Sequence, residues 1–207
     1  MRAPDWDQRY ATAEYVWHTA PNQFLPLEVS ELPVGRALDL AAGEGRNAVW
    51  LARQGWQVTG IDFSHAGIAK GARLAADHDV TVEWICADAT TWTPSPTFDL
   101  VVVFYLQLAA DERRLAFERA ARGLAPGGTL LIVGHASANL TDGVGGPQDP
   151  AVLYSPEDVA ADVEGAGIAG MVVDRAEHVL RPVQTPDGQR DAIDCLLRAH
   201  RTTEETP

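Results

Sequence analysis

Two closely spaced glycines form the part of the sequence best suited to chemistry. Gly43 and Gly45 stand in the run AAGEGRNA, directly after an apolar segment and directly before a helical pattern. Glycine lets the backbone turn sharply and approach a ligand without a Cβ in the way. The helix that follows directs its free N–H groups and its positive dipole end into the same space. The run is therefore typical of a pocket for a nucleotide-like ligand.

Two acidic residues extend this predicted pocket. Asp62 ends the next apolar segment, where its carboxylate is placed to accept both hydrogen bonds from a ribose diol. Asp88, in the run CADAT, ends the third apolar segment and is placed to meet the base end of the ligand. The spacing of Gly43, Gly45 and Ala48 also satisfies the relaxed dinucleotide fingerprint, so these residues alone leave NAD open as the ligand.

The elements that position these residues alternate between apolar segments and amphipathic helical patterns. We expect strands over residues 36–41, 57–61, 80–87, 98–105 and 129–134, and helices over residues 45–54, 64–77, 111–122 and 155–164. Such alternation requires a mostly parallel sheet with helices on both faces. Residues 171–180 and 192–200 predict two further strands, joined by the turn-forming run TPDGQR. The expected fold is α/β and Rossmann-like: a doubly wound, seven-stranded, mostly parallel sheet with an antiparallel C-terminal hairpin strand.

Two irregular segments flank the expected ligand edge of this sheet. Residues 1–33 are rich in aromatic side chains, with helical spacing around residues 6–17, and Pro21, Pro26 and Pro33 prevent one long helix. Residues 135–154 form a loop too long to be a simple connection, which makes it a candidate lid or binding loop. In open α/β sheets ligands bind beyond the carboxyl ends of the strands, so both segments are candidates to cover the site.

The composition indicates one globular domain spanning all 207 residues. With 16 basic and 29 acidic residues the net charge is -13, which argues against nucleic acid and anionic membranes as partners. Cys86 and Cys195 show no metal-type spacing, and we expect no metal. The N-terminus lacks the apolar core of a signal peptide, so we expect a cytoplasmic protein. The sequence does not indicate an oligomeric state.

In this order and spacing the motifs resemble those of the class I S-adenosylmethionine-dependent methyltransferases. LDLAAGEGRNA resembles their first motif, GIDFS their second-strand acid, CADA their third motif, and LAPGGTLLIV their turn into the fifth strand. The resemblance covers residues 35–133 and, more loosely, both ends. It is nearest to the small-molecule group that includes tellurite-resistance and thiopurine methyltransferases, in which residues 1–33 resemble a lid over the cofactor. The core then spans residues 34–200, with a tail over residues 201–207.

The resemblance implies S-adenosylmethionine as cofactor, S-adenosylhomocysteine as product, and methyl transfer to a small acceptor through S, N, O or a metalloid. The implied cofactor contacts run from the methionine end to the lid: Asp39, Ala41, Gly43 and Arg46 at the methionine end, Asp62 at the ribose, Phe63, Asp88 and Ala89 at the adenine, Phe104 and Tyr105 beside the methyl group, and Trp6, Tyr10 and Trp17 in the lid. Ordinary structural roles compete with several assignments. A loop cap is the alternative for Asp39, core packing for Phe63 and Phe104, and surface-helix packing for Trp6 and Trp17.

The acceptor side is less well defined by the sequence. His135 ends the fifth predicted strand and is the best candidate for acid–base chemistry or acceptor contact, although a hydrogen bond to the loop backbone explains it equally well. Gln107, Asn139 and Tyr154 are further acceptor-side candidates from their loop positions. No general-base motif stands out, and methyl transfer does not require one, so we assign no catalytic residue.

Three functions stay open at this point, with the methyltransferase preferred. An NAD-linked oxidoreductase rests only on the relaxed glycine fingerprint. The aromatic lead-in, the second acid and the closing hairpin without a separate substrate domain argue against it. A non-catalytic protein that binds adenosylmethionine or adenosylhomocysteine is the other alternative.

Overall fold

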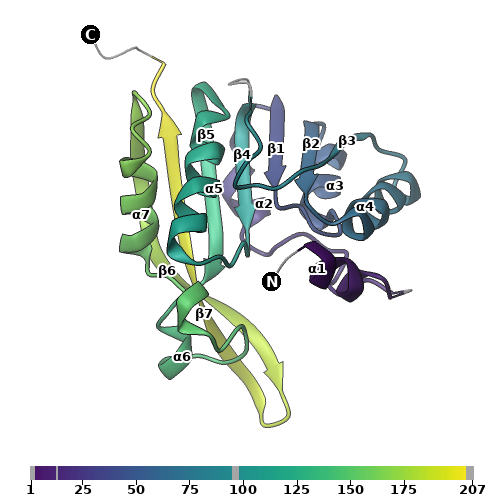
Figure 1. Ribbon diagram of the computed structural model, residues 1–207, viewed down its shortest axis with the longest axis vertical. Coiled ribbons are helices and arrows are strands. Elements are labelled where there is room, and N and C mark those ends of the chain that lie inside the picture. The colour runs from purple at the N-terminus through teal and green to yellow at the C-terminus, as the bar shows by residue number, and fades with distance from the viewer. Residues whose placement is uncertain (1–2, 13, 95–97, 204–207) are drawn as a thin grey trace.

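The computed structural model describes residues 3–12, 14–94 and 98–203, and these residues form a seven-stranded sheet (Figure 1). The strands are β1 (Arg36–Leu40), β2 (Gln57–Asp62), β3 (Val82–Cys86), β4 (Phe98–Phe104), β5 (Leu124–His135), β6 (Met171–Thr185) and β7 (Gly188–Arg201). Their order in the sheet is β3-β2-β1-β4-β5-β7-β6. Strands β1 to β5 pair in parallel, whereas β7 runs antiparallel to both β5 and β6. The expected α/β, mostly parallel fold is confirmed, with the antiparallel strand one place in from the edge.

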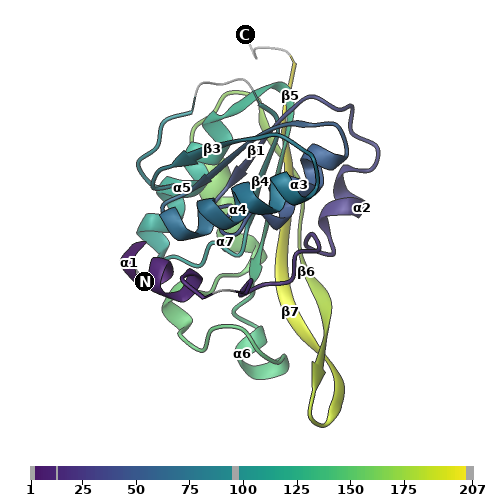
Figure 2. The same cartoon turned by 90° about the vertical axis from the view of Figure 1, so that its right-hand side faces the viewer.

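Helices cover both faces of this sheet, as Figures 1 and 2 show from two directions. They are α1 (Ala3–Tyr10), α2 (Leu25–Val29), α3 (Arg46–Arg53), α4 (His65–Asp77), α5 (Ala110–Arg122), α6 (Asn139–Asp142) and α7 (Pro156–Gly165), with a 3-10 turn at Pro150–Val152. Helices α5 and α7 contribute to the core on one face, and α2, α3 and α4 to the core on the other. Along β4, Val101 and Val103 face the first core and Leu100 and Val102 the second, the period-2 alternation of a fully buried strand.

Local sequence signals account for where the main helices begin. The hydroxyl of Ser64 accepts a hydrogen bond from the N–H of Gly67 and caps α4, as predicted. Ser155 and Asp158 form a reciprocal capping box around Pro156 at the start of α7. These caps fix the two helices that lie on opposite faces of the sheet.

The largest differences from the predicted boundaries lie in α1, in β5 and in the closing hairpin. Helix α1 ends at Tyr10, although the helical spacing continues to Trp17. The N–H groups of Val16 and Trp17 donate to the Glu44 carboxylate and not to helical carbonyls. Strand β5 begins at Leu124, because Leu124 pairs with Phe98 at the start of β4 and a register shift precedes the next pair, Leu100 with Thr129. The closing hairpin is longer than expected, with only residues 186 and 187 between its strands.

The site-bearing end of the molecule is the end at which the parallel strands finish. Figure 1 shows α1 and α6 on this lower side of the sheet, with the tip of the β6–β7 hairpin projecting below them. Residues 95–97, between the predicted strands over residues 80–87 and 98–105, and residues 204–207 of the predicted tail lie outside the described residues. Among the described helices, none combines the length and the apolar character needed to cross a membrane.

Candidate cofactor and acceptor site

The glycine loop at the end of β1 adopts an unusual backbone. Ala41, Gly43 and Gly45 have φ values of 67°, 56° and 84°, the left-handed region that side chains disfavour. A Cβ on Gly45 would lie 2.6 Å from the Trp84 ring and 2.8 Å from the Cα of Gly71, so only glycine fits between α3 and α4. The loop therefore presents bare backbone at the start of α3. A strained non-glycine residue such as Ala41 marks a candidate functional site.

Asp62 ties this loop to the end of β2. Its buried carboxylate accepts hydrogen bonds from the N–H of Gly43 at 2.8 Å and of Ser64 at 2.9 Å. Burial raises the pKa of Asp62 above its usual value, and these hydrogen bonds oppose the shift. Each carboxylate oxygen has a further lone pair, so Asp62 shapes the loop and still has acceptor capacity for a ligand hydroxyl.

One carboxylate oxygen of Asp39, next to the same loop, accepts no hydrogen bond from the described residues. The residue is 1% exposed, and its Oδ2 has no hydrogen-bond partner among the described residues. Burial raises the pKa of Asp39 to about 7; the charge of Asp62 adds to this shift, and the Ala48 N–H opposes it. Buried polar oxygens are rarely left without a donor. The loop-cap alternative accounts for one hydrogen bond of this carboxylate but not for the unpaired oxygen, which suits a donor such as the ammonium of an amino acid.

Arg46 places a positive charge beside Asp39. It is half-buried and makes no hydrogen bond or ion pair to the residues that the structure describes, so its guanidinium is available to an anion. Burial lowers the pKa of Arg46, whereas the nearby Tyr105 and Asp39 raise it. The loop thus offers an acceptor at Asp39 and a donor at Arg46, the complement of an amino acid's two charged groups. The residues present fit the methionine end of S-adenosylmethionine.

The candidate adenine side lies at the ends of β2 and β3. Phe63 is half-buried and belongs to neither apolar core, so core packing does not account for it. Asp88 is exposed, and its Oδ1 accepts hydrogen bonds from the N–H and hydroxyl of Thr90 at 2.8 and 2.7 Å. Its neighbour Ala89 is buried. A half-buried ring beside a turn-held carboxylate is a suitable surface for a base.

The N-terminal segment is fastened over the glycine loop by a residue that we did not single out from the sequence. Glu44, between the two glycines, is buried and accepts hydrogen bonds from the N–H groups of Val16 and Trp17, both at 3.0 Å. Lys70 of α4 forms an ion pair with the same carboxylate at 2.8 Å. The only signal in the sequence was an acidic residue between the two glycines.

The aromatic residues of this segment lie together. The hydroxyl of the buried Tyr10 would lie 3.0 Å from a Cβ on Gly43, so its ring covers the glycine loop. Burial raises the pKa of Tyr10 well above its usual value. The guanidinium of Arg9 lies 5.0 Å from the ring centres of both Trp6 and Trp17. The predicted lid residues are thus brought together at the glycine loop.

The opposite side of the site is formed by four linked polar residues, here called the Asp194 cluster: Tyr105, His135, Arg181 and Asp194. Asp194 is fully buried and accepts hydrogen bonds from the Tyr105 hydroxyl at 2.7 Å, the Arg181 Nε at 2.6 Å and the His135 Nδ1 at 3.2 Å. Burial acts to raise the pKa of Asp194, but the hydrogen bonds from His135 and Arg181 outweigh it and lower the pKa. Tyr105 also has a left-handed φ of 55°. Sequence reasoning missed Asp194 and Arg181; a single acid within the apolar strand AIDCLL was the available signal.

The other residues predicted beside the methyl group or acceptor have structural contacts. Phe104 is buried in the core shared with α3, so core packing accounts for it. The side-chain oxygen of Gln107 accepts the His135 N–H at 3.0 Å, and its amide donates to the carbonyl of Val152. Asn139 is buried and bonds to the loop carbonyl of Gly145 and the N–H of Ile193. Tyr154 is fully buried, and its hydroxyl has no partner among the described residues.

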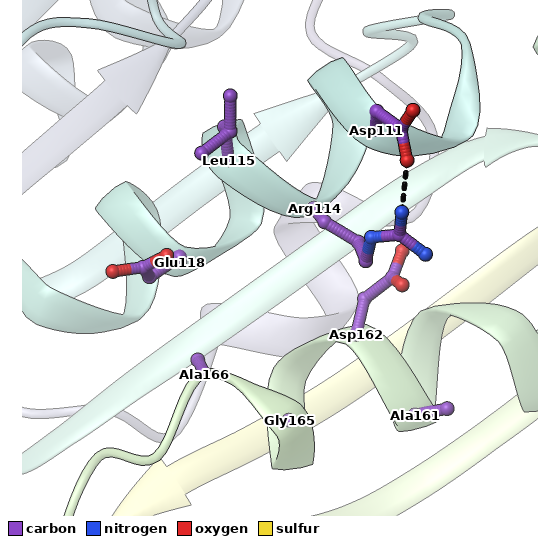
Figure 3. A pocket seen from close by; sticks show the side chains of 8 residues that line it. All are labelled: Asp111, Arg114, Leu115, Glu118, Ala161, Asp162, Gly165 and Ala166. Atoms are coloured by element: carbon purple, nitrogen blue, oxygen red, sulfur yellow. Dashed lines mark hydrogen bonds and ion pairs between the residues drawn. The ribbon is translucent and has the colours of Figure 1, made fainter.

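A shallow groove elsewhere on the surface does not join this site. It has a volume of about 420 Å³ and lies between α5 and α7, where Arg114 pairs with Asp111 (Figure 3). The residues that line it belong to the two helices on the outer face of the sheet, not to the ends of the parallel strands. The groove therefore does not compete with the glycine loop as the candidate site.

The fold and the glycine loop together define a class of protein. A sheet of order β3-β2-β1-β4-β5-β7-β6, with β7 antiparallel and the glycine loop after β1, is the class I methyltransferase arrangement, whereas dinucleotide-binding sheets add a sixth parallel strand. Residues 37–128 match the family described as a methyltransferase domain. Thiocyanate methyltransferase 1 of Brassica oleracea is 30% identical over 162 residues, which span 76% of this chain and 67% of that protein.

Two solved structures share the fold. The N-methyltransferase NodS from Bradyrhizobium japonicum WM9, in complex with S-adenosylhomocysteine, has a TM-score of 0.71 and 20% identity, with 98% of each chain covered. TehB from Haemophilus influenzae has a TM-score of 0.72 and 16% identity, with 97% of this chain and 67% of that chain covered. The chain belongs to the S-adenosylmethionine-dependent methyltransferases. The methyl donor, and not a nicotinamide dinucleotide, is the cofactor of this family.

Proposed function

We propose that this methyltransferase acts on a small-molecule acceptor at the edge where β1, β4 and β5 end. The observation that carries the proposal is the unpaired, buried Oδ2 of Asp39 beside a glycine loop in a left-handed conformation. A buried oxygen without a donor in the protein is suited to a ligand that brings one. The similarity to thiocyanate methyltransferase 1, whose name specifies a small acceptor, supports the size of the substrate.

We propose the following division of the site among the residues. The cofactor contacts are Asp39, Ala41, Gly43 and Arg46 for the methionine end, Asp62 for the ribose, Phe63, Asp88 and Ala89 for the adenine, and Tyr105 near the methyl group. Trp6, Tyr10 and Trp17 close the site from residues 1–33, which act as a lid on a core over residues 34–200. His135 and Gln107 border the acceptor, with Asn139 and Tyr154 supporting the loop around it.

The proposed mechanism assigns alignment and water exclusion to the protein. S-adenosylmethionine supplies, when bound, a methyl group on a sulfonium that reacts by in-line displacement. Asp39 and Arg46 would hold the amino-acid end and Asp62 would hold the ribose, which would orient the cofactor at the edge where β4 ends. Tyr10 covers the glycine loop and excludes water from it. Such positioning and desolvation supply most of the rate enhancement for a reaction whose reactivity resides in the cofactor.

The direct test is product formation with a panel of small acceptors. The purified protein is incubated with S-adenosylmethionine and each acceptor, and adenosylhomocysteine and methylated product are measured together by mass spectrometry. The proposal expects equal amounts of the two products with at least one acceptor. Cofactor binding without turnover across thiols, phenols, amines, carboxylates and soft anions would identify a non-catalytic binder instead.

A further inference from the structure

The Asp194 cluster fixes one imidazole at the acceptor side of the site. The Nδ1 of His135 lies 3.2 Å from Oδ1 of the fully buried Asp194. The ring of His135 contacts the ring of Tyr105, with 4.7 Å between their centres. On the loop side, a Cβ on Gly146 would lie 3.1 Å from the same Nδ1, so the backbone there packs closely against the imidazole. His135 is therefore held between β4, β7 and the loop.

The charges around Asp194 determine which nitrogen carries the proton. Arg181 donates to Asp194 at 2.6 Å and Tyr105 at 2.7 Å, so the carboxylate is ionised and accepts hydrogen bonds only. The His135 Nδ1 must then donate to it, which leaves the lone pair of neutral imidazole on Nε2. Nε2 makes no hydrogen bond to any described residue, and the side chain keeps 16% of its surface exposed. The titratable and charged groups near His135 are Asp194, Tyr105 and Arg181, with Arg46 beyond Tyr105 and Arg181.

We propose that His135 is the general base of this enzyme, that Asp194 is its positioning residue, and that the acceptor is a small molecule whose nucleophilic atom carries a proton. This inference rests on the proposed function and narrows its substrate class to thiols, phenolic or enolic hydroxyls and neutral primary or secondary amines. In the step, a lone pair of the acceptor forms the bond to the methyl carbon. The carbon–sulfur bond breaks with its electrons on sulfur, and the acceptor's proton goes to Nε2 of His135.

Acceptors without a proton distinguish this proposal from methyl transfer that needs no base. An anion such as thiocyanate has no proton to lose, so a base beside it contributes nothing to its methylation. A positioned base contributes about 10²–10⁴-fold to reactions that do require proton removal. The two acceptor classes should therefore respond differently to loss of the imidazole.

A matched control exists in the neighbouring pair of strands, β6 and β7. The Nδ1 of His200 lies 2.8 Å from Oδ1 of Asp174, and both side chains are more than one-third exposed. In the β5–β7 ladder His200 pairs with Thr129, at the end opposite to the pairing of His135 with Asp194. The same His→Asn substitution can thus be made in two His–Asp pairs, only one of which lies at the site.

The experiment compares His135→Asn and His200→Asn with the wild-type protein. The asparagine amide can still donate to the neighbouring carboxylate but has no basic nitrogen. With thiophenol, catechol and a primary amine as probes, His135→Asn should lower turnover at least 100-fold and remove the acidic limb of the pH profile, whereas His200→Asn should change neither. Both variants should bind adenosylhomocysteine as the wild type does. Turnover of these probes by His135→Asn at the wild-type rate would overturn the proposal. Methylation of thiocyanate and iodide only, by the wild-type protein, would also overturn it.

A second measurement is independent of the acceptor. Long-range ¹H–¹⁵N NMR of the wild-type protein, at a pH where the imidazole is neutral, should show His135 protonated at Nδ1 and bare at Nε2, and Asp194→Asn should alter that tautomer. A proton on Nε2 would overturn the proposal even if none of the probes is methylated. Failure to bind adenosylhomocysteine would contradict the proposed function, and the tautomer measurement in the free protein would still decide the role of His135.

Discussion

At the scale of single residues, the proposed cofactor contact of Asp39 has a consequence for folding stability. Its pKa is raised from 3.8 to about 7, so the folded protein binds a proton between these pH values that the unfolded chain has released. The free energy of unfolding must therefore fall as the pH rises through this window, and the penalty is fully present above pH 7. The buried Asp39 carboxylate, which would accept a hydrogen bond from the ligand, therefore lowers the free energy of unfolding of the ligand-free protein.

Asp39→Asn should change stability and cofactor binding in opposite directions. Asparagine keeps an oxygen for the Ala48 N–H but carries no charge, so the free energy of unfolding at pH 8 should rise, on the order of 2–4 kcal/mol, and the gain should vanish near pH 4. Urea unfolding at both pH values measures it, with the exposed Asp174→Asn as control. Affinity for adenosylhomocysteine should fall about tenfold or more. A variant that is no more stable at pH 8 would contradict the assigned charge state.

Asp62→Ala tests the proposed ribose contact at the same scale. Loss of the carboxylate should weaken adenosylhomocysteine binding by about 1–3 kcal/mol, because ligand hydroxyls lose their partner in a closed site. It should also destabilise the free protein, since the N–H groups of Gly43 and Ser64 lose their acceptor. Calorimetry and thermal unfolding separate the two effects, and unchanged affinity would exclude a ribose contact.

The site residues that the sequence could identify are those that lie within or next to a short motif. Gly43, Asp62 and Asp88 were found because each ends a predicted strand, where α/β sheets bind ligands. Asp194 and Arg181 were not found, because they meet His135 only through the antiparallel pairing of a strand remote in sequence. Which long-range strand pair forms cannot be read from local periodicity.

At the scale of elements, Glu44 connects the glycine loop, the N-terminal segment and α4. Glu44→Gln should weaken the two hydrogen bonds to residues 16 and 17 and abolish the ion pair with Lys70. We expect hydrogen exchange of the Val16 and Trp17 amides to rise about tenfold or more, since local opening becomes easier. Glu83→Gln, which affects a contact between β2 and β3, is the control. Unchanged exchange at residues 16 and 17 would show that Glu44 does not hold the lid.

Gly45 tests the packing of α3 against α4. Gly45→Ala should lower the free energy of unfolding by about 2–4 kcal/mol, because a Cβ would overlap Trp84 and Gly71 and the left-handed backbone adds strain. Gly165→Ala is the matched control, since nothing lies within 4 Å of the added carbon and helix α7 tolerates alanine. Equal stability of the two variants in denaturant titrations would contradict the packing described here.

The regular elements were largely predictable, and the short ones were not. Strands and long helices followed from hydrophobic periodicity and caps, as for Ser64 at the start of α4. Helices α2 and α6 have five and four residues, too few to produce a periodic pattern. The path of residues 14–24 was also beyond prediction, because it is set by hydrogen bonds to Glu44 and Asn47 and not by its own sequence.

At the scale of the whole molecule, the sheet brings two distant halves of the chain to one edge. Asp39, Arg46 and Asp62 come from the first three elements of the core, and His135, Arg181 and Asp194 from the last three strands. Tyr105, at the end of β4, stands between the two groups, hydrogen-bonded to Asp194 and electrostatically coupled to Arg46. The proposed cofactor side and the proposed acceptor side thus meet where the strand order reverses.

The measurement that tests this account most directly is titration calorimetry with adenosylhomocysteine, with NAD in a parallel cell. The account predicts micromolar binding of adenosylhomocysteine and no heat from NAD, because Asp39, Arg46 and Asp62 match the charged and hydroxyl groups of the first ligand. Binding of NAD without binding of adenosylhomocysteine would contradict it. The glycine loop would then be a dinucleotide site, and the lid held by Glu44 would need another explanation.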